Sequence, residues 1–63
     1  MTGSQSPRDR VLWILSEHGG QLDRSRLRRH TGMRYALLDP ILEELARDGK
    51  VRITGEMITL ASR

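Results

Sequence analysis

The chain contains 63 residues, with a formal net charge of +3 and a pI of about 10.6. This length predicts one domain near the lower limit for independent folding. The absence of cysteine excludes disulfides, thiolate zinc sites and cysteine-ligated iron–sulfur clusters. No apolar run approaches the roughly 18 residues of a membrane span, and Met1–Ser6 lacks the apolar segment of a signal peptide. We therefore expect no membrane insertion and, by default, a cytoplasmic location.

The positive charge is concentrated in one part of the chain. Between Asp23 and Asp39 there is no acidic residue, and the basic side chains there are Arg24, Arg26, Arg28, Arg29 and Arg34. The segment that follows carries the carboxylates of Asp39, Glu43, Glu44 and Asp48. This pattern predicts one positive and one negative face. All the basic residues named here are arginines. Arginine suits bidentate contacts to phosphate and guanine, but a genome rich in G and C would also favour arginine.

A first helix is predicted to begin at Ser6, and its signals are local. Ser6 is a good cap, Pro7 suits the first helical position, and Asp9 stands where the acid of a capping box reaches back. The predicted apolar face of this helix consists of Val11, Leu12, Ile14, Leu15 and His18. Gly19 and Gly20 then end the helix.

Trp13 lies off this apolar stripe, towards the side of Glu17 and Arg10. One interpretation is a half-buried ring that rests on the N-terminal tail or on the C-terminal hairpin. The other is an exposed anchor for a second subunit or a partner protein, since tryptophan is enriched at interface hot spots. The residues alone leave both interpretations open.

A very short strand over 21–23 and a helix over 24–30 are predicted next. Leu22 of the strand points to the core, and Asp23 caps the helix. Leu27 is the only large apolar residue of the helix, which therefore depends on its neighbours for stability. Its arginines form either a solvated face or a set of phosphate contacts.

A third helix is indicated by an apolar series at spacings i, i+3, i+4 and i+7: Leu38, Ile41, Leu42 and Leu45. Pro40 complicates its start, because proline has no N–H for the carbonyl of Ala36. Either the helix starts near Tyr35 and bends at Pro40, or the regular helix begins with Asp39 as cap and Pro40 in the first position. We expect a bent or late-starting helix, which ends at Gly49.

The rest of the chain alternates as a β-hairpin. Val51 and Ile53 are expected to point inward, and Gly55-Glu56 fits a two-residue turn with glycine first. The returning strand over 57–60 carries inward residues at Ile58 and Leu60. The whole predicted core is Val11, Leu12, Leu15, Leu22, Leu27, Met33, Leu38, Ile41, Leu42, Leu45, Val51, Ile53, Ile58 and Leu60.

The Thr31-Gly32-Met33 turn and the run Leu45-Ala-Arg-Asp-Gly49-Lys-Val51 resemble the winged helix-turn-helix family. In that family a T-G-φ turn precedes a recognition helix, which ends in L-x-x-x-G-x-V before a β-hairpin wing. The resemblance runs from about Pro7 to Leu60. It implies an α+β winged helix, with three helices and a short two- or three-stranded antiparallel β wing. We expect a disordered tail at 1–5 and the domain at 6–61.

The resemblance implies double-stranded DNA binding with modest sequence specificity, by a small transcriptional regulator. Helix 24–30 would lie on the DNA backbone, and residues near Arg34 and Tyr35 would face the major groove. The expected contact residues are Arg24, Arg26, Arg28, Arg29, Arg34, Tyr35 and Arg52. A monomer of this size buries little DNA, so we expect a homodimer on two half-sites, with Trp13 at its contact.

The alternative function is a winged-helix adaptor that binds a protein and no DNA. The carboxylates of the third helix, Pro40 within it, and Glu56 at the wing tip favour this alternative. One group of small winged-helix proteins, the regulators of ferrous-iron transport, looks similar over the helices. Its cysteine-bearing members hold a cluster in the wing, which this chain has no cysteine to bind. RNA binding is a third hypothesis, although one Trp and one Tyr offer little stacking surface.

Other chemistry has little support in the sequence. His18 and His30 are the only histidines, and neither has a second ligand at metal spacing. The glycines form no phosphate loop, and the chain is too short for a sizeable substrate pocket. We expect no metal, no cofactor, no small-molecule ligand and no enzymatic activity.

Overall fold

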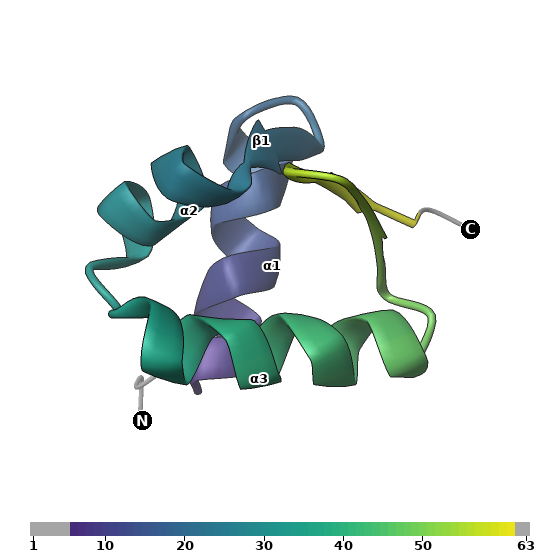
Figure 1. Cartoon of the computed structure of the whole chain (residues 1–63). Helices are drawn as coiled ribbons and strands as arrows, with labels where there is room; N and C mark the ends of the chain where they lie inside the picture. Colours follow the sequence, from purple (N-terminus) through teal and green to yellow (C-terminus); the bar gives the residue numbers. More distant parts are fainter. Residues whose placement is uncertain (1–5, 62–63) are drawn as a thin grey trace, which may run out of the picture.

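The computed structural model describes residues 6–61, so the tail predicted at 1–5 lies outside the described residues. The elements follow the chain as α1 (Pro7–Glu17), β1 (Gln21–Asp23), α2 (Arg24–Thr31), α3 (Tyr35–Arg47), β2 (Val51–Thr54) and β3 (Met57–Leu60). The architecture is α+β, as predicted. Figure 1 shows α3 crossing one side of the domain, with the chain folding back from its C-terminal end towards β1. Within residues 6–61, no helix has the length and apolar character needed to cross a membrane.

The first two helices begin where the sequence predicts, because their caps are local. The Asp9 N–H donates to Ser6 Oγ at 3.2 Å, and Pro7 occupies the start of α1. The Arg26 N–H donates to Asp23 Oδ1 at 3.2 Å and caps α2 in the same way. A side-chain acceptor at the N-cap satisfies one of the free N–H groups of the first turn.

The turn between α2 and α3 is built on Thr31 and Gly32. Thr31 is buried, and its Oγ1 donates to the Arg28 carbonyl at 3.1 Å and accepts from the Met33 N–H at 3.2 Å. Gly32 has a φ of +74°, a left-handed conformation that suits glycine, and its N–H donates to the Arg28 carbonyl at 2.9 Å. This turn sets the direction in which α3 begins.

The third helix begins at Tyr35 and continues through Pro40 to Arg47. Of the two starts left open by the sequence, the one near Tyr35 is confirmed, and the late start with Asp39 as cap is wrong. An early start places Leu38 in one continuous helix with the other buried residues of this face, and Leu38 is fully buried. The carbonyl that Pro40 leaves without a partner belongs to Ala36, an exposed residue whose carbonyl water can satisfy.

The sheet has three antiparallel strands in the order β1-β3-β2. Leu22 of β1 pairs with Ile58 of β3, and Ile53 of β2 pairs with the same residue from the other side. Thr54 and Met57 flank the two-residue turn, and Gly55 has a φ of +59°, so the glycine-first turn is confirmed. β2 is thereby left at one edge of the sheet.

The core lies between the three helices and the sheet, and most of its predicted members are confirmed. The buried apolar residues are Val11, Ile14, Leu15, Leu22, Leu27, Leu38, Ile41, Leu42, Leu45, Val51 and Ile58. Partly buried residues pack against them, and the predicted ones among these are Leu12, Met33 and Leu60.

Two expectations about the core are wrong. Ile53 is 40% exposed, because it lies on the edge strand where the hairpin diverges from α3 and leaves a hollow beside it. His18 does not join the apolar face of α1, because the helix ends at Glu17 and His18 becomes its exposed C-cap. The His18 ring lies back on that helix, with Nδ1 2.9 Å from the Ile14 carbonyl oxygen.

Candidate nucleic-acid interface

Two arginines of α2 lie against the ring of Tyr35 at the start of α3. Arg24 Cζ is 4.4 Å and Arg28 Cζ is 5.1 Å from the centroid of that ring. The two arginines stand four residues apart, so they share one face of α2. A guanidinium over an aromatic face keeps its in-plane N–H donors available for other partners. The sequence predicted all three residues as contacts, and the structure brings them together.

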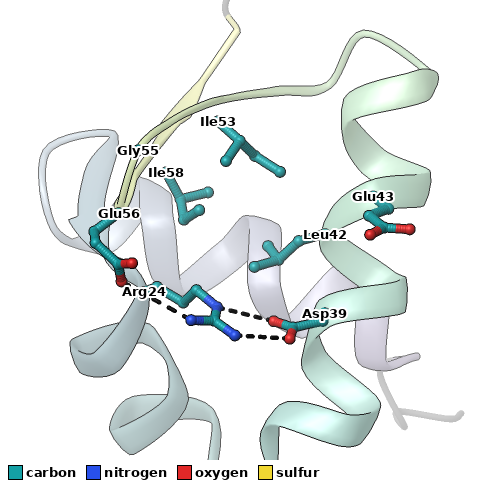
Figure 2. Close-up of a pocket in the computed structure, with 8 residues that line it drawn as sticks. All are labelled: Arg24, Asp39, Leu42, Glu43, Ile53, Gly55, Glu56 and Ile58. Atoms are coloured by element: carbon teal, nitrogen blue, oxygen red, sulfur yellow. Dashed lines mark hydrogen bonds and ion pairs between the residues drawn. The ribbon is translucent and has the colours of Figure 1, made fainter.

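The guanidinium of Arg24 is directed at two carboxylates of the same domain. Its Nε donates to Asp39 Oδ1 at 2.9 Å and its Nη2 to Asp39 Oδ2 at 2.7 Å, while Nη1 lies 3.9 Å from Glu56 Oε1. Figure 2 shows this guanidinium between the two carboxylates. The hydrogen bonds from Arg24 lower the pKa of Asp39, and the same contact raises the pKa of Arg24. Sequence reasoning missed this pair.

Arg28 is exposed, and so are two further predicted arginines: its chain neighbour Arg29, and Arg34, which precedes Tyr35. Within residues 6–61, no carboxylate lies within ion-pair distance of any of them. Arg26 is also exposed, and its Nε is 3.9 Å from Asp23 Oδ1. The free positive charge of α2 therefore lies towards its C-terminal end and the turn that follows.

The N-terminus of α3 has backbone donors without a side-chain cap. Arg34 occupies the N-cap position and its side chain makes no capping hydrogen bond. The N–H groups of Leu37 and Leu38 both donate to the Arg34 carbonyl, at 3.0 and 2.9 Å. The N–H groups of Tyr35 and Ala36 have no acceptor within the helix, because the Arg34 carbonyl is the first one. Free N–H groups at the positive end of the helix dipole, beside an exposed arginine, form an arrangement that can hold an anion.

The solvent face of α3 is poorer in donors than its N-terminus. The residues opposite the buried stripe at helical spacing are exposed, and they are Ala36, Pro40, Glu43 and Arg47. Only Arg47, in the last turn, offers a cationic group. This face carries few side chains that can read base edges.

The remaining predicted site residues lie apart from the cluster. Arg52 is exposed on β2, and Figure 1 shows the hairpin well separated from the end of α2 that leads to α3. Trp13 is 54% exposed on α1 and points away from Val11 and Leu15, which are fully buried. The side chain is thus accessible, as the anchor interpretation requires.

The two histidines lie together, although neither has a sequence neighbour that suggests a site. Their ring centroids are 4.4 Å apart with the planes inclined by 42°. His18 follows α1 and His30 lies in the last turn of α2, so the pair marks where two helix ends meet. In the part of the chain that the structure describes, no group of three or more side chains could hold a metal ion.

Comparison of the chain with models of known protein families and with curated proteins finds no match.

Proposed function

We propose that the chain is a winged helix-turn-helix domain that binds double-stranded DNA, as a small transcriptional regulator. The order of helices and strands, the Thr31-Gly32 turn before α3 and the terminal hairpin support the assignment to this fold. The observation that carries the function is the uncapped N-terminus of α3, which lies beside Arg34 and next in the chain to the exposed arginines of α2.

In this proposal α2 lies along a DNA backbone. Arg28 and Arg29 bind phosphates, and the free N–H groups at the start of α3 bind another phosphate oxygen. Arg34 and Tyr35 face the major groove, where arginine is the commonest reader of guanine. Arg24 fixes the relative positions of α2, α3 and the hairpin. It contributes little to DNA binding directly. The sparse donors on the rest of α3 imply modest sequence specificity.

The same proposal includes a homodimer. One domain of this size covers a small part of a duplex, so two copies on two half-sites give useful affinity. Trp13 is the proposed contact, because it is a large exposed aromatic side chain on a helix face directed away from the core.

The test is a titration of a labelled mixed-sequence duplex by fluorescence anisotropy, repeated at several salt concentrations. Removing two phosphate contacts in Arg28→Ala/Arg29→Ala should weaken binding to every sequence and reduce the slope of log K against log salt by about 2. The control is Arg10→Ala/Lys50→Ala, which removes the same charge at exposed positions outside the proposed interface. Equal losses from both pairs, or no binding by the parent protein at low salt, would contradict the proposal.

A further inference from the structure

A hollow of about 240 Å³ lies between α3 and the β2–β3 hairpin. Its apolar side chains are Leu42, Ile53 and Ile58, of which Ile53 is 40% exposed and the other two belong to the core. Figure 2 shows Ile53 and Ile58 on the hairpin side and Leu42 on the facing side of α3. An exposed isoleucine beside buried side chains gives an incoming apolar group a surface to cover.

The polar lining of this hollow is acidic. It contains the carboxylates of Asp39, Glu43 and Glu56 against the single guanidinium of Arg24. The Arg24 guanidinium neutralises Asp39 through two hydrogen bonds, whereas its Nη1 is 3.9 Å from Glu56 Oε1. Within residues 6–61, Glu43 has no cationic side chain at ion-pair distance. The hollow therefore repels phosphate and attracts a cationic partner.

The strand beside the hollow also has a free edge. In a hairpin with a two-residue turn, Thr54 and Met57 form the first hydrogen-bonded pair, so Arg52 is the next β2 residue whose backbone faces β3. The backbone groups of Val51 and Ile53 then point to the open side of β2. Among the described strands none pairs with that side. An unpaired edge of this kind can accept an additional strand.

We propose that an extended segment of a partner protein docks here, with the pattern basic–x–Val or Ile–x–basic. Its backbone pairs with the open edge of β2 at Ile53. Because side chains alternate in a strand, the apolar residue and both basic residues of this pattern fall on the face of the hollow. The apolar residue covers the exposed Ile53 beside Leu42, and the basic residues approach Glu43 and Glu56. Arg24 of α2 lines this surface, but Arg28 and Arg29 do not, and the proposal does not depend on DNA binding.

The test is an NMR titration of the ¹⁵N-labelled chain with the capped peptide Lys-Thr-Val-Thr-Lys. Saturable shifts are expected at Ile53, Gly55 and Leu42. Glu43→Gln/Glu56→Gln should weaken peptide binding at least fivefold. It removes the unpaired carboxylate of Glu43 and the loosely paired carboxylate of Glu56, and it keeps the side-chain shape. The control Glu17→Gln/Glu44→Gln makes the same charge change on other surfaces and should bind as the parent does.

Two further peptides separate this mode from simple charge attraction. Lys-Val-Thr-Thr-Lys has the same composition but turns valine to the other face, and Glu-Thr-Val-Thr-Glu reverses the charge; neither should give saturable shifts. The proposal is overturned by equal affinity for the two lysine peptides, by no saturable shift, or by shifts centred on α1. Shifts at Ile53 that grow with protein concentration alone would assign the hollow to a second copy. Shifts there with a DNA duplex would assign it to nucleic acid. Arg28→Ala/Arg29→Ala should bind the peptide normally, which separates this test from that of DNA binding.

Discussion

Arg24 and Asp39 form a two-pronged ion pair that joins the start of α2 to the second turn of α3, with N–O distances of 2.9 and 2.7 Å. The Arg24 backbone N–H also donates to the Glu56 carbonyl at 2.7 Å, so the same residue reaches the hairpin turn. Its guanidinium lies over Tyr35 as well. One side chain therefore sets the relative position of three segments that surround both proposed binding surfaces.

This pair predicts a specific dependence of stability on pH. Hydrogen bonds from Arg24 place the pKa of Asp39 in the folded protein below its ordinary value. The stabilisation is therefore fully present above about pH 4, the ordinary aspartate pKa, and is lost as the pH falls through the lower folded-state pKa. Thermal unfolding should show Asp39→Asn less stable than the parent at neutral pH, with the difference vanishing in acid. A difference that stays constant down to acid pH would contradict this account.

Leu27 anchors α2 to the hydrophobic core. It is fully buried and is the only large apolar residue in this helix. Leu27→Ala should cost about 2–5 kcal/mol, in a domain whose total stability is of the order of 3–5 kcal/mol. Circular dichroism and urea unfolding should find the variant largely unfolded. Leu37→Ala is the control, since Leu37 is 48% exposed, and it should change the stability by less than about 0.5 kcal/mol.

Replacement of Pro40 is expected to stabilise the domain. It lies inside α3 and removes the hydrogen bond to the Ala36 carbonyl. Pro40→Ala restores that bond and should raise the free energy of unfolding by about 1–3 kcal/mol. Pro7→Ala, at the first position of α1 where no helical bond is lost, should change it much less. Urea titrations compare the two variants, and an equal effect of both would show that the interior position carries no special cost.

Trp13 allows the proposed dimer to be observed directly, because it is the only tryptophan of the chain. Its emission should resemble that of a solvent-exposed indole in dilute protein and shift to shorter wavelength as the concentration rises. Sedimentation velocity should show Trp13→Ala as a monomer under conditions where the parent dimerises. A dimer that survives Trp13→Ala would place the contact elsewhere, and a parent that stays monomeric would remove the dimer from the proposal.

Features with local causes could be predicted from the sequence. Ser6 and Asp23 cap their helices from adjacent residues, and Gly55 permits its turn by its own backbone freedom. The apolar spacing that starts at Leu38 predicted the buried face of α3 because helical periodicity is also local. The sequence left two starts open for this helix, since proline disfavours the helix interior locally while burial of Leu38 favours the longer helix.

Features that depend on packing between elements could not be predicted. Arg24 and Asp39 are 15 positions apart, and only the crossing of α2 and α3 brings them together. His18 and His30 meet for the same reason. The alternating pattern correctly suggests the face on which Ile53 lies, but whether a helix covers that face depends on where α3 ends relative to the hairpin. Sequence periodicity holds no information on that relation.

DNA binding at the start of α3 is tested most directly by a ¹⁵N NMR titration of the chain with a mixed-sequence DNA duplex at low and moderate salt. We expect shifts concentrated between Arg28 and Ala36, strongest at the N–H groups that begin α3, and weaker as salt increases. Absence of any shift at low salt, or shifts confined to Trp13 and the acidic hollow, would contradict DNA binding through this surface.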